Sequence, residues 1–478
     1  MTDRVVVVGG GVAGLTAART LARAGRQVLV LEASPRLGGK IISVTPGGVP
    51  LDGGPESLLA RRPEAVRLVE ELGLPIVHPT GASSKLLIKG RLHPLPRQAM
   101  GIPADLDELT ELLDPDDLDR ARREPDLPAP ALSGDLGIGE YVDARFGPAV
   151  TDRLLEPMLG GVYAGRAREL SFEAVNRALY ERARGGGSLL DHAADLVAAG
   201  RNGAGGPVFA GLPGGVSRLL PALADDLEQY GVEVRTGVTV RELERAGAGY
   251  RLTLGAATSS PLTVPGRTAR ETVEADSVVL AVPAAPLSRL LGDLAGPVVE
   301  EVARVPYASM AVVTLVVRGF TGDGSGALVP PGELPTIKAF THSSVKWGWV
   351  ADAARAAWGP DVAVIRASVG RIGEEGLLQL DDERLVTRTF AEARDRVPGW
   401  PGTELITHAV ARFGGGLPQY LVGHVDLVRR LREAVGAHPG LAVCGALLDG
   451  VGIAACIGSG LTAAETIMND RSSTGTRA

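Results

Sequence analysis

Three glycines near the N-terminus have the spacing with which a chain binds a dinucleotide. Gly9, Gly11 and Gly14 form a G-x-G-x-x-G pattern directly after the β-branched run 5–8. The first glycine of such a pattern permits a tight turn, the second lets a pyrophosphate approach the backbone, and the third lets a helix pack on a strand. Further along, Glu32 carries a carboxylate that can accept hydrogen bonds from a ribose diol. Together these residues predict a dinucleotide site, whereas an empty βαβ unit would leave Glu32 without a role.

These residues need a strand, a turn, a helix and a second strand in this order. The run 5–8 shows no polar alternation, which is typical of a strand buried on both faces of a parallel sheet. An apolar stripe predicts a helix over about 13–24, and a second buried strand over 28–31 delivers the acidic residue. We therefore predict a Rossmann-like unit whose cofactor contacts are Gly9, Gly10, Gly11, Val12, Ala13, Gly14, Glu32 and Ala33.

The segment after the second strand favours FAD over NAD as the dinucleotide. It reads Pro35-Arg-Leu-Gly-Gly-Lys40. This is similar to the R-x-G-G-[RK] segment of two-dinucleotide-binding flavoproteins, in which the glycines approach the cofactor and the basic residue balances its phosphates. We expect Gly38, Gly39 and Lys40 to contact FAD in this way. The alternative is a glycine-rich surface loop, because turn-forming glycine pairs are common.

The composition is that of a globular protein with more than one domain. Of the 478 residues, 45% are hydrophobic and 22% charged, and the formal net charge is -7, so we expect two or three domains. The mild acidity argues against nucleic-acid binding, which needs clustered Lys and Arg. Two cysteines are too few for a disulfide framework, and no metal-ligand or nucleophile constellation occurs. Apolar runs fall short of the roughly 20 residues of a membrane-spanning helix. These features predict a cytoplasmic protein without a metal, with peripheral membrane contact left open.

Several further motifs, taken in order, resemble one family nearly end to end. They are Leu51-Asp-Gly-Gly-Pro-Glu-Ser57, Gly90-Arg-Leu-His-Pro-Leu-Pro96 with Gly101-Ile-Pro103, Gly160-Gly-Val-Tyr-Ala-Gly165, Gly211-Leu-Pro-Gly-Gly215, Leu417-Pro-Gln-Tyr-Leu-Val-Gly-His424 and Asp449-Gly-Val-Gly-Ile453. Their joint occurrence resembles the bacterial, soluble type of protoporphyrinogen and coproporphyrinogen III oxidases, within the amine-oxidase-like flavoprotein superfamily. The Val-Tyr-Ala-Gly string separates this family from true amine oxidases.

The resemblance implies an α/β fold in three parts. A discontinuous, two-dinucleotide-binding-type Rossmann-like FAD domain would be accompanied by an α+β substrate domain and a helical insertion. We expect the FAD domain in segments 1–90, 206–285 and 426–470, the helical, pocket-covering insertion at 91–205, the substrate domain at 286–425 and a disordered tail at 471–478.

The same resemblance adds cofactor contacts that the N-terminal unit does not contain. It implies a turn against the flavin, a valine whose backbone addresses the adenine, and a helix N-terminus directed at the flavin pyrimidine ring, where negative charge develops on reduction. Where relatives have Gly-Asp or Gly-Asn, this chain has Gly445-Ala446, so a side-chain contact expected there is in doubt. The residues implied are Gly54, Pro55, Glu56, Ser57, Val240, Phe413, Gly445, Val451, Gly452 and Ile453.

The activity implied is the six-electron oxidation of coproporphyrinogen III to coproporphyrin III in haem biosynthesis. It would proceed in three hydride transfers to flavin N5, each followed by reoxidation with O2 and release of H2O2, without a catalytic side chain. Alternatives are protoporphyrinogen IX as the substrate, oxidation of amines or polyamines, and flavin binding without turnover. Aromatic residues make up only 4% of the chain, which leaves few candidates for the aromatic cage that amine substrates use.

Basic residues are the expected partners of substrate propionates. Arg61 and Arg62 follow the turn 53–57, although a solvated basic pair is an equal alternative. The cations of Arg91, His93 and Arg97 favour the four propionates of coproporphyrinogen III over the two of protoporphyrinogen IX. Lys338, His342 and Lys346 are further candidates, each with the alternative of an ordinary surface cation. The sequence predicts no oligomeric state.

Overall fold

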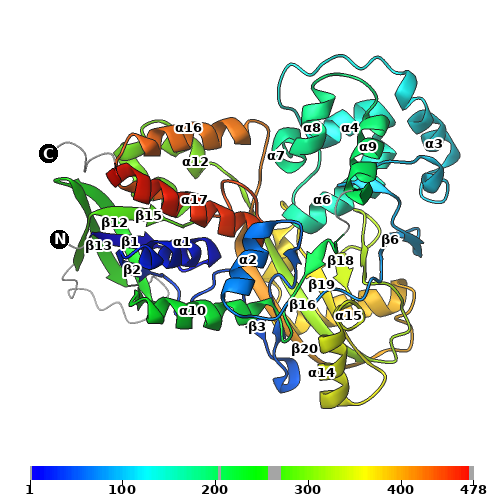
Figure 1. The fold of residues 1–478 in the computed structure, drawn as a ribbon. Coiled ribbons are helices and arrows are strands. Elements are labelled where there is room, and N and C mark those ends of the chain that lie inside the picture. The colour runs from blue at the N-terminus through cyan, green and yellow to red at the C-terminus, as the bar shows by residue number, and fades with distance from the viewer. Residues whose placement is uncertain (1–2, 203–205, 257–270, 473–478) are drawn as a thin grey trace.

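The computed structural model describes residues 3–202, 206–256 and 271–472. Its two largest sheets belong to different parts of the molecule. Figure 1 shows the parallel sheet and its helices on one side, the second sheet on the other, and a group of helices above the second sheet. Most of the tail expected at 471–478 lies outside the described residues; only 471 and 472 are described, at the end of the last helix.

The first sheet is five-stranded and entirely parallel, as the Rossmann-like prediction requires. Its order is β11 (Glu233–Arg235), β2 (Gln27–Leu31), β1 (Arg4–Val8), β15 (Ser277–Leu280) and β21 (Leu441–Val443). Alternate residues of β1 serve opposite faces of the sheet, so that Val5 and Val7 pack on one side and Val6 and Val8 on the other. The continuous β-branched run is thereby explained, since both faces are buried.

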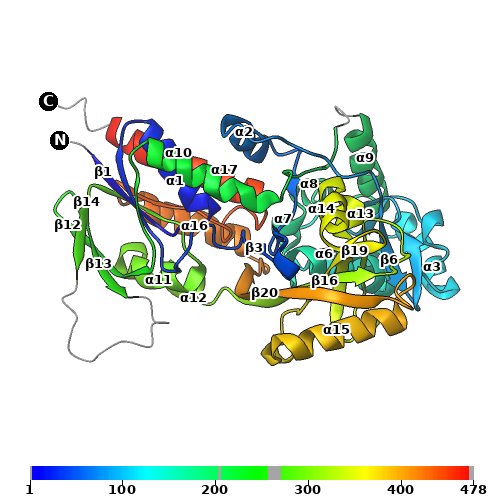
Figure 2. The ribbon, with the colours of Figure 1, turned by 90° about the horizontal axis from the view of Figure 1, so that it is seen from below.

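Two layers cover this sheet. One face packs against α1 (Val12–Arg23), α10 (Leu219–Gln229) and α17 (Ile453–Ser472), with α2 (Pro63–Glu71) beside them. The other face packs against α11 (Ala284–Leu291), α12 (Val298–Ala303), α16 (His424–Gly436) and an antiparallel sheet of β12 (Val238–Ala246), β13 (Gly249–Ala256) and β14 (Thr272–Ala275). Figure 2 shows these layers on either side of β1. The FAD part is therefore discontinuous in sequence, as expected.

The second sheet is seven-stranded and mostly antiparallel. Its order is β20 (Glu404–Pro418), β16 (Tyr307–Arg318), β19 (Val362–Val369), β18 (Ile337–Thr341), β17 (Gly326–Leu328), β6 (Ser84–Ile88) and β7 (Arg91–Pro94). The apolar core on one face includes α15 (Asp382–Arg396). On the opposite side, α13 (Ser343–Lys346) and α14 (Gly348–Trp358) lie against β19.

The hairpin β6–β7 corrects one expected boundary. A domain limit at residue 90 would assign 84–90 to the FAD part and 91–94 to the helical insertion, but both strands join the seven-stranded sheet through parallel pairing of β6 with β17. Leu87 packs into the core beneath α15, whereas Leu86 and Ile88 pack against the helical insertion. The alternating pattern is compatible with any half-covered sheet edge, so the sequence could not identify the partner strand.

The helical insertion has a core of its own. Its helices are α3 (Pro115–Arg122), α4 (Ile138–Phe146), α5 (Pro148–Val150), α6 (Glu156–Tyr163), α7 (Phe172–Val175), α8 (Arg177–Ala183) and α9 (Leu189–Asn202). Short strand pairs connect the parts: β3 (Ser43–Val44) with β4 (Leu51–Asp52), β5 (Leu58–Leu59) with β10 (Phe209–Ala210), and β8 (Gln98–Ala99) with β9 (Ile102–Pro103). None of the helices in the described residues combines the length and the apolarity that crossing a lipid bilayer demands.

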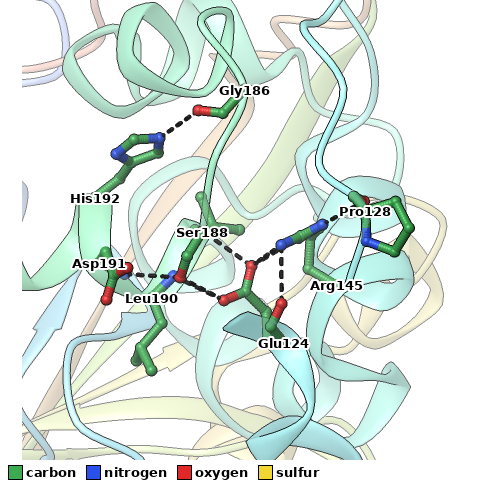
Figure 3. A network of polar contacts seen from close by, with 9 residues as sticks. Glu124, Pro128, Arg145, Gly186, Ser188, Leu190, Asp191 and His192 are labelled. Carbon is green, nitrogen blue, oxygen red and sulfur yellow. Dashed lines mark hydrogen bonds and ion pairs between the residues drawn. The ribbon is translucent and has the colours of Figure 1, made fainter. Parts of the chain in front are cut away.

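A buried carboxylate fixes the start of α9 within this insertion. Glu124 is fully buried and forms an ion pair with Arg145, whose Nε lies 2.6 Å from Glu124 Oε1 (Figure 3). The same carboxylate accepts hydrogen bonds from the backbone N–H of Leu189 at 2.8 Å and from the Ser188 hydroxyl at 2.7 Å. Because a helix N-terminus leaves N–H groups unpaired, Glu124 both neutralises Arg145 and caps α9.

Candidate functional site

A cavity of about 380 Å³ opens at the carboxyl ends of the parallel strands. Its lining begins where β1 ends at Val8 and Gly9, where β2 ends at Leu31 and Glu32, and just after β15 at Ala281. The carboxyl edge of an open parallel sheet is the usual place for a nucleotide cofactor. The cavity is thus where the glycine pattern predicts it.

The glycine turn at this edge has the geometry of a phosphate-binding loop. Gly9 has φ of 110°, and a Cβ there would collide with the carbonyl oxygen of Ala281. A Cβ at Gly14 would collide with the carbonyl oxygen of Gly9, so this glycine permits α1 to pack on the turn. At Gly11, by contrast, an added Cβ would meet no atom within 4 Å. The three glycines therefore have different roles. Gly9 and Gly14 avoid collisions with neighbouring backbone atoms, whereas Gly11 leaves space at the cavity.

Glu32 is fixed at the cavity by backbone hydrogen bonds. Its Oε2 accepts a hydrogen bond from the N–H of Gly10 at 2.6 Å, and its Oε1 accepts one from the N–H of Ser34 at 2.7 Å. Each carboxylate oxygen has a second lone pair that can accept a ribose hydroxyl. The side chain is thus held in place for the role predicted from its position.

The basic segment after β2 contributes an unpaired cation. Gly38 donates its N–H to the carbonyl of Gly10 at 2.8 Å, which brings the segment alongside the glycine turn. Lys40 lines the cavity, and among the described residues it has neither a hydrogen-bond nor an ion-pair partner. Burial lowers the pKa of its ammonium group. A half-buried ammonium without a counter-ion fits a cavity that receives an anionic group such as a pyrophosphate.

The N-terminus of α17 faces the same cavity. Val451 and Ile453 line it, and the N–H of Cys456 makes the first helical hydrogen bond to the carbonyl of Gly452 at 3.0 Å. The first turn of α17 contains no acidic residue that would offset its positive end. The helix therefore presents free N–H groups and a partial positive charge to a ligand.

The backbone around Ala446 is held in place despite the missing polar side chain. Ala446 lines the cavity, and its carbonyl accepts a hydrogen bond from the Tyr420 hydroxyl. His424 stacks on Tyr420 with 4.1 Å between ring centroids, and its Nε2 lies 2.9 Å from the carbonyl oxygen of Leu447. Burial lowers the pKa of His424 to about 4, so this imidazole is neutral and donates from Nε2. Tyr420 and His424 thus fix the backbone carbonyls of Ala446 and Leu447 at the cavity wall.

The turn 53–57 is held by side chains of the substrate part. Pro55 lines the cavity, but Glu56 and Ser57 do not. Glu56 is paired with Arg366 at 2.9 Å and with Lys346 at 3.0 Å, and Lys346 also donates to Ser57 Oγ at 2.9 Å.

The electrostatics of Glu56 show how tightly this turn is held. Burial by itself would raise the pKa of the carboxyl group, but the charges of Lys346 and Arg366 outweigh it and lower the pKa to about 2. Trp347 Nε1 and the Ser343 hydroxyl also donate to it, at 3.0 Å and 2.7 Å. Glu56 therefore joins the FAD part to α13, α14 and β19, and its predicted contact with the cofactor stays a prediction.

Most of the predicted cofactor residues meet at the cavity, although they come from separate segments. Those that line it are Gly9, Gly11, Val12, Ala13, Glu32, Ala33, Gly38, Gly39, Lys40, Pro55, Val240, Gly445, Val451 and Ile453. Those that do not are Gly10, Gly14, Gly54, Glu56, Ser57, Phe413 and Gly452. Phe413 lies half-buried on β20 opposite Met310, and a Cβ at Gly54 would collide with the Lys40 carbonyl, so both have structural roles here.

One wall of the cavity was not predicted from the sequence. It is formed by α11 and by Pro283, which precedes this helix. Pro283, Pro286, Arg289 and Leu290 line the cavity, and Arg289 donates to the carbonyl of Val240 at 3.2 Å. A strand followed at once by a helix, at residues 277–291, is the signal that could have found this wall. The junction lies at the carboxyl edge of the same parallel sheet.

Arg61, Arg62 and Arg97, which were predicted as substrate contacts, do not line the cofactor cavity. Arg61 and Arg62 are exposed at the start of α2 and do not line the cavity, and Arg62 lies 3.1 Å from Glu64. Arg97 is paired with Asp105 and with Glu108, the latter at 2.6 Å. A role for Arg61 or Arg62 against the substrate stays a prediction, whereas Arg97 has its charge matched within the chain.

The fold and the cavity define the class of the protein. A glycine turn, the Glu32 carboxylate, a lysine unpaired among the described residues and a helix N-terminus converge at one edge of a parallel sheet, and a second domain adjoins that edge. This is the arrangement of a two-dinucleotide-binding flavoprotein.

Comparison with known proteins gives the family. The model of the flavin containing amine oxidoreductase family matches residues 12–468, and the chain belongs to this family. Coproporphyrinogen III oxidase of Mycobacterium tuberculosis (strain ATCC 25618 / H37Rv) is 35% identical over 96% of both chains. The Bacillus subtilis (strain 168) enzyme of the same name is 30% identical over 96% of both chains. A solved structure from Exiguobacterium sp. 255-15, provisionally named protoporphyrinogen oxidase, superimposes with a TM-score of 0.81 at 30% identity, covering 98% of this chain and 99% of that one. The chain is an FAD-dependent oxidoreductase.

Proposed function

We propose that this enzyme oxidises coproporphyrinogen III to coproporphyrin III, with O2 as the electron acceptor and H2O2 as the second product. The observation that carries the proposal is the 35% identity to an oxidase of that name over 96% of the chain, because the similarity spans the substrate sheet and the helical insertion as well as the cofactor cavity. Bound FAD supplies a two-electron acceptor that O2 can regenerate. The expected cytoplasmic setting stays a prediction.

The protein contributes binding and electrostatics to this reaction. The glycine turn and Lys40 hold the anionic part of the cofactor, and the start of α17 favours negative charge that develops when electrons arrive. Glu32 is engaged by two backbone N–H groups. The Cys456 thiol, which lines the cavity, stays protonated because burial raises its pKa to about 11. These side chains therefore position the reactants, and protons released from pyrrole nitrogens pass to water.

The substrate is tested by measuring both porphyrinogens side by side. Porphyrin fluorescence is followed with the holoenzyme, and the rate of spontaneous oxidation is subtracted using enzyme whose FAD has been removed. We expect a higher kcat/KM for coproporphyrinogen III. A clear preference for protoporphyrinogen IX would assign the alternative substrate, and no enzyme-dependent oxidation of either would reject porphyrinogen oxidation altogether.

The electron acceptor is tested by stoichiometry. Six electrons leave each porphyrinogen, so we expect three molecules of O2 consumed and three of H2O2 formed for each porphyrin. A reduced flavin that O2 fails to reoxidise would instead favour flavin binding without an oxidase function. Loss of O2 dependence with an added quinone would identify a different acceptor.

Amine oxidation is a second candidate because the family as a whole is described as amine oxidoreductases. Aromatic residues make up only 4% of the chain, which leaves few candidates for the aromatic cage that amine substrates use. H2O2 formed during incubation with monoamines or polyamines would support this alternative. We expect none above the background of the enzyme alone.

A further inference from the structure

A buried lysine on the substrate sheet has neither a hydrogen bond nor an ion pair for its side-chain nitrogen among the described residues. Lys338 lies on β18 and is only 1% exposed, and its Nζ makes no hydrogen bond to any described residue. The nearby charge of Arg371 disfavours the ammonium form, and that of Glu374 favours it less strongly. An amine buried in this way is costly for the fold. Such a group calls for a function outside the folding of the chain itself.

A second buried cation lies beside it. Arg371 is 6% exposed, on the loop that follows β19. One Nη donates to the carbonyl of Val329 at 2.9 Å, and the other is 3.8 Å from the half-exposed carboxylate of Glu374. Its Nε has no hydrogen-bond partner among the described residues. The guanidinium therefore keeps an unused N–H in the interior.

The unused N–H of Arg371 lies beside the glycine face of α6. A Cβ built at Gly160 would have only Arg371 Nε within 4 Å, at 3.9 Å, and one built at Gly161 would have only a methyl group of Leu328, at 3.6 Å. Two consecutive glycines thus leave this helix face without a side chain of its own opposite Arg371, and the same helix packs against β18, which carries Lys338. The helix comes from the insertion and the cations from the substrate sheet, so this face lies between these two parts.

This place is connected to the cofactor cavity by direct contacts. At the end of α6, Tyr163 packs on Tyr420 with 5.6 Å between ring centroids, and Tyr420 holds the carbonyl of Ala446 at the cavity wall. The loop that carries Arg371 is fixed to the same end of α6, because the N–H of Ile372 donates to the carbonyl of Ala164 at 2.8 Å. The end of α6 thus contacts both the loop that carries Arg371 and, through Tyr420, the cavity wall at Ala446.

The acidic residues nearby do not neutralise both cations. Glu156 is close enough to influence Arg371, but it forms no ion pair with it, and its Oε2 accepts the N–H of Ala167 at 2.7 Å. Burial raises the pKa of the Glu156 carboxyl group. Glu374 is then the only acidic residue that contacts Arg371 among the described residues. An anion from outside the chain would complete the pairing.

We propose that Lys338 and Arg371, with the glycine face of α6, form a binding site for one carboxylate of the substrate, a propionate of the porphyrinogen. This inference rests on the proposed function. Arg371 Nε and Lys338 Nζ would each donate to a carboxylate oxygen, which matches the acceptor capacity of a carboxylate. The exposed pair Arg61 and Arg62 would then be unnecessary for this propionate.

The test uses the holoenzyme and two variants of similar side-chain volume, Lys338→Met and Arg371→Met. KM for coproporphyrinogen III and the dissociation constant of coproporphyrin III, a stable probe, are measured for each. Loss of a charge-assisted hydrogen bond predicts that both constants rise about tenfold or more, with kcat changed far less and FAD content unchanged. The matched controls are Lys89→Met and Arg304→Met, whose side chains are exposed, and they should leave both constants unchanged.

A second measurement distinguishes a binding site from a structural role. Without porphyrin, Lys338→Met should raise the melting temperature, because a buried amine without a partner is replaced by an apolar side chain. A variant that melts earlier and loses FAD would show that the lysine supports the fold, and the proposal would be wrong.

The pH dependence provides an independent readout. The pKa of Lys338 is lowered to about 7, first by burial and then by Arg371. Binding a carboxylate requires the protonated amine, so KM of the wild type should rise above pH 7, and this rise should be absent in Lys338→Met. If the wild type turns over coproporphyrinogen III and both variants have unchanged KM, the carboxylate site is wrong but the proposed function stands. If the wild type shows no turnover, the proposed function is wrong.

Discussion

Replacing Gly11 by valine should remove FAD without unfolding the chain. Gly11 has φ of -75° and ψ of 170°, an extended conformation that valine adopts readily, and an added Cβ would meet no atom within 4 Å. The change should therefore shift the free energy of unfolding of the FAD-free protein by no more than about 1 kcal/mol. The new methyl groups would occupy the space that the pyrophosphate needs.

If Gly11→Val no longer binds FAD, added FAD should not raise the free energy of unfolding of this variant. A ligand present at about 1,000 times its dissociation constant stabilises the folded state by about 4 kcal/mol. Wild type and Gly11→Val should thus unfold at similar urea concentrations without FAD, and differ by about that amount when FAD is added. FAD retention is measured from the flavin absorbance of the purified protein, and unfolding from circular dichroism.

Gly14→Ala is the matched comparison, because it adds one methyl group three residues away. Its Cβ would collide with the Gly9 carbonyl and lie 3.0 Å from the Ala281 Cβ, so α1 would have to move away from the turn. We expect this variant to lose about 1–3 kcal/mol or more of stability even without FAD. If purified Gly11→Val kept a full complement of FAD with wild-type affinity, the assignment of this turn to the pyrophosphate would be refuted.

Three further changes test the groups that hold the site and its surroundings. Glu56→Gln should lower the free energy of unfolding by about 3–5 kcal/mol, because it leaves Lys346 and Arg366 without their carboxylate. Since the pKa of Glu56 is lowered to about 2, the wild type should lose this stability as the pH falls from about 4.5 towards 2. Equal acid unfolding of the wild type and the variant would contradict the pairing. Burial lowers the pKa of His424 to about 4, so the unfolded chain takes up a proton at this imidazole at a higher pH than the folded chain does, and the free energy of unfolding should fall by roughly 3 kcal/mol between pH 6.5 and 4. His424→Phe should flatten this part of the pH-dependent melting profile. An unchanged profile would argue against the neutral imidazole. Glu124→Ala should destabilise the helical insertion by about 3–5 kcal/mol, while the purified protein keeps FAD. The destabilisation is measured by amide hydrogen exchange in α9. If the α9 amides of the variant exchanged as slowly as those of the wild type, Glu124 would not be the cap of this helix.

The cofactor half of the protein could be predicted from the sequence because its signals are local. The glycine turn, the β-branched run before it and Glu32 after the next strand belong to one continuous unit, and each has a single physical use there. The structure places Gly9, Gly11 and Glu32 in the wall of the cavity. The alanine at position 446 was also visible in the sequence, but not the hydrogen bonds by which Tyr420 and His424, from a separate segment of the chain, hold the backbone there.

The substrate half was decided by tertiary structure, because the pairing of charges depends on residues far apart in sequence. Glu56 belongs to the turn 53–57, for which a cofactor contact was predicted, yet its partners Lys346 and Arg366 come from the substrate part and Glu56 does not line the cavity. Lys338 and Lys346 have the same side chain and lie eight positions apart, but one is buried without a partner and the other is paired. The amino-acid sequence by itself determined the cofactor, FAD, and predicted the glycine turn as its binding place. Only the packing of the insertion on the substrate sheet determined which cations remain available for a ligand, because burial and pairing are properties of the assembled chain.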